Sequence, residues 1–234
     1  MAEVGALDEM LSVREGVAFC WLGNAGWLIR AEGRLIAFDL DLDPGGIRLE
    51  PPPMSAEELA PKLDVLFITH EHGDHFNAYT CRTLVEASEC LFVVPANNVE
   101  KAREIGVPEA RIHVARPGEP FDLPGIHVEP QRAFHGHEDF AVLASANMFD
   151  CGYLLTAGGK RILQPGDSVL LQDHLTLESV DVLFVSPTVH NTHVDRSVVL
   201  IEALGPAHIF PQHFGTYRQD AENEFWTKGY PDEL

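Results

Sequence analysis

The sequence predicts one α/β domain in which β-sheets are covered by helices. Short apolar runs typical of strands recur along the whole chain, and segments with helical patterns lie between them. Of the 234 residues, 45% are hydrophobic and 22% are charged, so the chain can bury a sizeable core. Because no linker, low-complexity tract or fixed-period repeat interrupts this pattern, we expect residues 1–234 to form a single domain.

The predicted strands are apolar runs of strand length that are rich in β-branched or aromatic residues. Several are apolar at consecutive positions, as expected for strands that are covered on both faces. The clearest runs are residues 19–22, 35–38, 65–68, 91–94, 152–155 and 182–185.

The predicted helices lie between these runs. Residues 55–58, Ser-Ala-Glu-Glu, form a capping-box pattern directly after three prolines, which block a helix. The other helices are expected at residues 79–87, at 98–105 before Gly106, and at 196–204 before Gly205.

The composition limits the partners that we expect. There are 36 acidic and 16 basic residues, a formal net charge of -20, so most of the surface repels DNA and RNA. No apolar stretch approaches the length that spans a bilayer, and no signal peptide pattern is visible at the start. The four cysteines are not in C-x-x-C spacing and indicate free thiols in a reducing compartment. We therefore expect a cytoplasmic protein with a small-molecule substrate and neither a nucleic-acid nor a membrane partner.

One loop carries the strongest chemical signal. The strand-like run at 65–68 leads through one threonine into His-Glu-His-Gly-Asp-His at residues 70–75. Imidazole and carboxylate groups are suitable ligands for zinc and similar divalent ions. His70 and His72 are spaced to meet one ion, while Asp74 and His75 can reach a neighbouring one. A polar loop with coincidental histidines is the alternative, but three histidines in six residues after a strand favour a metal site.

The spacing His-x-His-x-Asp-His resembles the signature of the metallo-β-lactamase superfamily. Further motifs follow in that family's order from about residue 17 to about residue 217, with the opening hairpin and acidic motif at 21–26 and 35–39. The opening and closing motifs are most similar to the branch containing ascorbate-6-phosphate lactonase. The resemblance implies an αββα sandwich of two mixed sheets flanked by helices.

The resemblance also implies a ligand set for two divalent metal ions, which we expect to be zinc or manganese. The ligands of the first ion are His70, His72 and His135. The ligands of the second ion are Asp74, His75 and His213, with Asp167 bridging the two ions. From the residues alone, His137 competes with His135, and Asp167 also reads as a turn residue.

Other polar residues have expected places near this centre. Asp39, at a strand end, resembles the acid that orients ligating histidines in the family, whereas Asp41 and Asp43 are expected to be solvated. We assign His193 a catalytic role as a hydrogen-bonding group for the substrate or an oxyanion. For His190 we favour a place at the start of a helix.

The resemblance implies a metal-dependent hydrolase. A metal-bound hydroxide would cleave a lactone, ester or phosphoester of a small molecule, with Asp74 or Asp167 orienting the nucleophile or moving its proton. Two alternatives stay open: an iron redox enzyme of the same fold, and a metal-binding sensor protein without turnover. The sequence also leaves the oligomeric state open, a homo-oligomer included.

Overall fold

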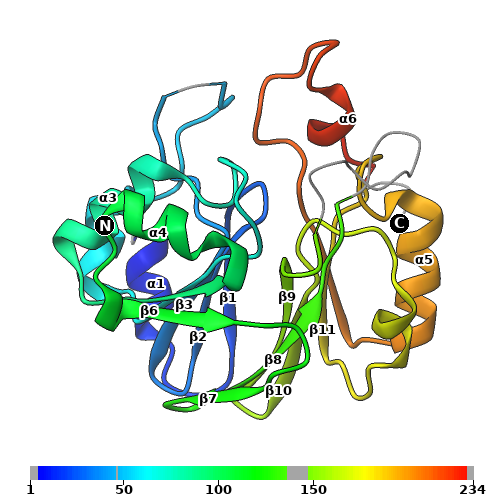
Figure 1. Ribbon diagram of the computed structural model, residues 1–234, viewed down its shortest axis with the longest axis horizontal. Coiled ribbons are helices and arrows are strands. Elements are labelled where there is room, and N and C mark those ends of the chain that lie inside the picture. Colours follow the sequence, from blue (N-terminus) through cyan, green and yellow to red (C-terminus); the bar gives the residue numbers. More distant parts are fainter. Residues whose placement is uncertain (1–4, 46, 136–146, 231–234) are drawn as a thin grey trace.

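The structure is a computed structural model that describes residues 5–45, 47–135 and 147–230. Two six-stranded sheets pack face to face, and helices cover the outer face of each (Figure 1). Both sheets are mixed, with antiparallel strands on one side and parallel strands on the other. The predicted αββα sandwich is therefore confirmed.

The N-terminal half of the chain forms the first sheet, in the order β1-β2-β3-β4-β5-β6. Its strands are β1 (Ala18–Gly23), β2 (Gly26–Ala31), β3 (Arg34–Phe38), β4 (Val65–Phe67), β5 (Leu91–Pro95) and β6 (Ile112–Ala115). Its outer face is covered by α1 (Ala6–Ser12), α2 (Ala56–Leu59), α3 (Ala78–Ala87) and α4 (Val99–Ile105) (Figure 1). Short 3₁₀ turns lie at Ala60–Lys62, Ala96–Asn98 and Glu109–Arg111.

The C-terminal half forms the second sheet, in the order β12-β11-β10-β9-β8-β7. Its strands are β7 (Phe121–Leu123), β8 (Ile126–Arg132), β9 (Cys151–Ala157), β10 (Lys160–Gln164), β11 (Val182–Val185) and β12 (His208–Pro211). The helix α5 (His193–Leu204) and the 3₁₀ turn Gln172–Thr176 pack on its outer face. No helix in the described ranges has the length and apolar character needed to cross a membrane.

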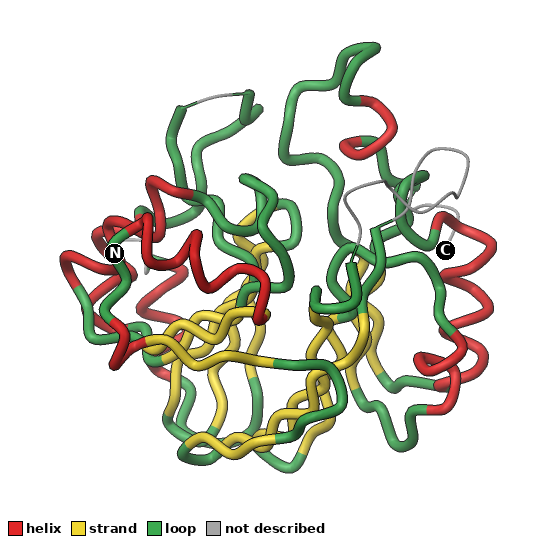
Figure 2. Tube along the Cα trace, viewed as in Figure 1, coloured by secondary structure: helices red, strands yellow, loops and turns green. Residues whose placement is uncertain are grey.

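The short helix α6 (Glu224–Thr227) lies apart from both outer layers. It sits among the loops at the upper edge of the sandwich, where loops from both halves of the molecule gather (Figures 1 and 2). These loops carry the candidate site, so α6 is placed to contribute to it.

Strand β3 shows why the predicted strands are apolar at consecutive positions. Leu35 and Ala37 join the core between the sheet and its helices, whereas Ile36 and Phe38 join the core between the two sheets. All four side chains are fully buried. Strands that lack such runs, such as β8, alternate buried and more exposed positions because only one face is covered.

The helix boundaries follow the predicted capping residues. Ser55 forms a complete capping box with Glu58 at the start of α2. Gly106 and Gly205 both end their helices in the left-handed conformation, with φ of 102° and 54°. The start of α5 differs from the prediction, because the helix begins at His193 rather than at residue 196.

Candidate metal centre

The candidate ligands lie at strand ends on one edge of the sandwich. The loop of residues 70–75 follows β4 in the first sheet, whereas His135, Asp167 and His213 follow β8, β10 and β12 in the second sheet. The two sheets face each other, so these ends meet although they are up to 143 residues apart in sequence.

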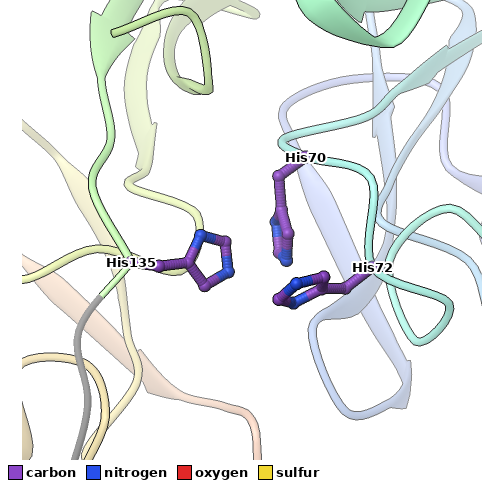
Figure 3. Close-up of side chains that lie close together, drawn as sticks. All are labelled: His70, His72 and His135. Carbon is purple, nitrogen blue, oxygen red and sulfur yellow. The ribbon is translucent and has the colours of Figure 1, made fainter. Parts of the chain in front are cut away.

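One group consists of three histidines from both halves of the molecule. His70 and His72 point toward His135 across the gap between the halves (Figure 3). Ring centroids are 4.1 Å apart for His70 and His135, and 4.6 Å for His72 and His135. One nitrogen from each ring lies within 4.8 Å of the others, so the three rings can bind one cation together.

A second group adjoins the first. Asp74, His75 and His213 each present one ligand atom within 4.8 Å of the others. Asp167 lies between the two groups: its Oδ1 is 3.5 Å from His75 Nε2, and its Oδ2 is 3.1 Å from His213 Nε2 and 4.0 Å from His135 Nε2. The structure thus brings together all seven residues expected as ligands.

A single buried carboxylate orients two histidines of the N-terminal half. The Thr69 hydroxyl donates to Asp39 Oδ2 at 2.7 Å, so its oxygen can accept the Nδ1 proton of His70 at 3.0 Å. His75 Nδ1 donates to the same Asp39 oxygen at 3.0 Å. Both rings therefore turn Nε2 toward the centre, which is the arrangement of a ligating histidine with a partner behind it. Asp39 contacts the loop as expected.

The histidines of the C-terminal half have separate partners. His213 Nδ1 donates to the backbone carbonyl of Trp226 at 2.9 Å. His135 Nδ1 lies 3.8 Å from Asp150 Oδ2, and Asp150 accepts hydrogen bonds from Asn97 and Asn147. These contacts again leave Nε2 facing the centre.

Glycine is required beside Asp167. Gly166 has φ of 68°, and a Cβ atom at this position would come within 2.9 Å of the Thr69 side chain. The turn that presents Asp167 therefore packs directly on the residue that links Asp39 and His70.

Burial and charge set the protonation of the centre. Burial lowers the pKa of His70 well below its ordinary value, so this ring is neutral. Burial alone would raise the pKa of Asp167, but the charges of His213 and the neighbouring histidines hold it well below its ordinary value. Burial acts to lower the pKa of His213, yet Asp167 and Asp74 raise it to about 9. A proton on His213 thus balances carboxylate charge, and cation binding would displace it.

The donor set fits divalent ions. Within the described part of the chain, His70 Nε2, His135 Nε2 and Asp167 Oδ1 are buried without a hydrogen-bond partner. Such orphaned atoms are costly unless something binds them. Imidazole nitrogen and carboxylate oxygen are ligands for zinc and manganese alike, so the two adjoining groups can hold two ions.

The structure places His190 and His193 differently from our expectation. His190 is buried, and its Nε2 donates to Asp167 Oδ2 at 2.7 Å, so it is part of the centre rather than a simple helix-start residue. His193 is the first residue of α5, and its ring packs on Tyr230. It is outside the described cavity lining, and its catalytic role stays a prediction. His137 lies outside the described residues.

Two polar residues near the centre have roles that the sequence did not show. Asn24 Nδ2 donates to Asp74 Oδ2 at 3.0 Å from the turn between β1 and β2. Asp41 was expected to be solvated, but its carboxylate accepts hydrogen bonds from Tyr217 and Asn77, at 2.6 and 2.9 Å. Asn24 belongs to the opening motif at residues 21–26, and this membership could have indicated that it lies near the functional site.

A cavity of about 310 Å³ opens over the two groups. Its floor consists of ligand candidates from both halves, and His190 also lines it. One wall is aromatic and consists of Phe225 and Trp226 on α6. The volume suits a small molecule.

Known proteins share both the sequence family and the fold. The family described as a beta-lactamase superfamily domain matches residues 40–214. A UPF0173 metal-dependent hydrolase from Carboxydothermus hydrogenoformans is 26% identical, over 89% of this chain and 90% of the relative.

Two solved structures illustrate the shared fold. A metallo hydrolase from Ignicoccus hospitalis has a TM-score of 0.66 at 21% identity, over 89% of this chain and 88% of that one. A diiron β-hydroxylase from Streptomyces venezuelae has a TM-score of 0.68 at 17% identity, over 86% of this chain and 45% of that one. One fold thus carries two different reaction types, so the site has to be read from its own residues.

Proposed function

The chain belongs to the beta-lactamase superfamily, and we propose that it is a metal-dependent hydrolase of a small molecule. One observation carries the proposal: two adjoining groups of nitrogen and oxygen donors, most of them buried, lie at the cavity, and His75 and His213 are each oriented by a hydrogen-bond partner behind the ring. The relatives named metal-dependent hydrolases support the same reaction class.

We assign the ligands of two divalent ions, zinc or manganese, to these groups. His70, His72 and His135 would hold the first ion. Asp74, His75 and His213 would hold the second ion, and Asp167, which lies close to both groups, would be shared. Bound ions would supply water that is activated near neutral pH, together with stabilisation of the negative charge that develops.

The chain's own residues orient the reactants. Asp74 lines the cavity and its side chain is 18% exposed, so its carboxylate can accept a proton from an attacking water. Asn24 holds one oxygen of that carboxylate in place. Asp167 is only 3% exposed and is bonded to His190, which suits a bridging ligand better than a mobile proton acceptor.

The expected substrates are lactones, esters and phosphoesters. The likeness of the opening and closing motifs to the ascorbate-6-phosphate lactonase branch supports a lactone. Substrate orientation falls to the residues that line the cavity, His190 among them.

The proposal is tested by metal analysis followed by an activity screen. Purified protein should contain about two zinc or manganese ions per chain and should hydrolyse at least one ester, lactone or phosphodiester in the presence of the same metal. His208→Ala is the matched control, because His208 is an exposed histidine on β12 that lies outside the cavity. Bound iron with a visible absorption band and no hydrolysis would favour a redox enzyme. Bound metal without any turnover would favour a sensor protein.

A further inference from the structure

The cavity above the candidate metal centre has two chemically different surfaces. Its floor presents imidazole and carboxylate groups, whereas Phe225 and Trp226 form an aromatic wall. Both aromatic residues are partly exposed, and both line the cavity. A molecule that reaches the floor therefore has to lie against apolar surface on this side.

Several contacts fix this wall relative to the floor. The Trp226 carbonyl accepts the His213 Nδ1 hydrogen bond at 2.9 Å, and the Trp226 ring lies 5.6 Å from the Tyr217 ring. The Phe225 ring lies edge-on to His190, with centroids 6.0 Å apart. The wall is thus tied to two residues of the centre and can define where a substituent lies.

Among the described residues, neither lysine nor arginine lines the same cavity. The sequence of residues 136–146 contains neither. Arg48 lines the neighbouring cavity, but its guanidinium donates to the backbone carbonyls of Asp41, Leu22 and Glu50. Lys101 likewise donates to the backbone carbonyl of Glu71. A second anionic group on a substrate would find no charged partner here except the ions themselves, on a chain of net charge -20.

We propose that the site takes a neutral ester or lactone whose acyl part carries an alkyl or aryl group, and that Phe225 and Trp226 select that group. This inference rests on the proposed hydrolase function. In the reaction, the oxygen of water bonds to the carbonyl carbon, the acyl carbon–oxygen bond breaks, and the leaving oxygen takes a proton. An ester gives a carboxylic acid and an alcohol, and a lactone gives one hydroxy acid.

The test uses two substrates that differ only at the end of the acyl chain. 4-Nitrophenyl hexanoate ends in a methyl group, and mono-4-nitrophenyl adipate ends in a carboxylate, while the bond and the leaving group are the same. We expect kcat/KM for the hexanoate to exceed that for the adipate by at least about tenfold, since a single methylene in an apolar pocket is already worth about 10- to 200-fold and a carboxylate would in addition lose its hydration there. Equal values, or a preference for the adipate, would overturn the inference while leaving the hydrolase function intact.

Variants of Phe225 test whether this residue causes the preference for the hexanoate over the adipate. Phe225→Ala should lower kcat/KM for the hexanoate about tenfold and leave that for the adipate nearly unchanged. Phe225→Leu keeps apolar surface and should preserve the preference, whereas Phe225→Arg should shift it toward the adipate. Val199→Ala removes exposed apolar surface on α5, outside the cavity lining, and should change neither value. An equal loss on both esters in Phe225→Ala would assign the residue to stability and overturn its selective role.

A binding measurement separates this inference from the proposed function. If metal-replete protein hydrolysed no ester, lactone or phosphodiester, the hydrolase proposal would fail. Calorimetric titration with hexanoate and with adipate would then show whether the cavity prefers an apolar or a charged chain end. Hexanoate binding about tenfold more tightly, and losing that advantage in Phe225→Ala, would support the apolar wall. Equal affinities would overturn it.

Discussion

The two halves of the molecule contribute to the centre in different ways. The N-terminal half supplies four candidate ligands from one six-residue loop after β4. The C-terminal half supplies one ligand from the end of each of three separate strands. The first arrangement depends on local spacing, whereas the second exists only because the second sheet aligns its strand ends.

The support behind the ligands differs in the same way. In the N-terminal half, Asp39 serves His75 directly and His70 through Thr69. In the C-terminal half, His135 and His213 have separate partners. A change at Asp39 should therefore disturb both ions, while a change behind His135 or His213 should act on one ion.

The largest expected effect comes from removing a ligand of the N-terminal loop. His72→Ala should lose most of one ion per chain and lower activity by more than about 100-fold, beyond the usual cost of losing a residue behind a ligand. Because the His72 side chain is partly exposed above the sheets, the fold should persist. Elemental analysis, circular dichroism and steady-state kinetics measure this, with His208→Ala as the control. Normal metal content in His72→Ala would break the ligand assignment.

Replacing the shared carboxylate of Asp39 should lower metal affinity more than removing a single hydrogen bond in the other half. Asp39→Asn should weaken metal affinity about 10- to 100-fold and affect both ions, because an amide replaces the acceptor of both hydrogen bonds. His190→Gln should act near the lower end of that range, since His190 contacts only Asp167 among the candidate ligands by hydrogen bond. Competition with a chromophoric chelator measures both affinities. If His190→Gln were the more damaging, the comparison between the halves would be reversed.

Metal removal should loosen the contact between the halves. Binding to the folded state adds about 2.7 kcal/mol of unfolding free energy when free metal is 100-fold above Kd, which corresponds to about 5–10 °C in Tm for a chain of this size. Differential scanning calorimetry with and without a chelator measures the shift. The shift should shrink in His72→Ala and persist in His208→Ala. An unchanged Tm in wild-type protein after complete metal removal would contradict a structural role for the ions.

The smallest effect concerns His174, which supports the second sheet away from the ligands. Burial lowers its pKa, and its Nε2 donates to the Arg132 carbonyl at 2.8 Å. The unfolded state therefore binds a proton first as pH falls, so stability is full above about pH 6.5 and declines below it, toward the folded-state pKa. Chemical denaturation between pH 7 and 5, with chelator in all samples, should show a smaller decline for His174→Gln than for wild type. An identical decline in both proteins would show that His174 does not contribute to the loss of stability at low pH.

The fold could be predicted from the sequence because its signals are local. The consecutive apolar residues of β3 and β4 reflect strands covered on both faces, and Ser55, Gly106 and Gly205 set helix ends through their own hydrogen bonds and dihedral angles. The start of α5 was less clear, because its first residue, His193, has φ of 49° and gives no capping signal.

By itself, the sequence predicted a metal site after β4, because three histidines and an aspartate lie within six residues of one loop. Only the tertiary structure decided what joins that loop. His190 reaches Asp167 across 23 residues, and the aromatic wall of Phe225 and Trp226 reaches the floor through His213. These residues carry no local pattern, since their neighbours in space are set by how two sheets align their strand ends rather than by spacing along the chain.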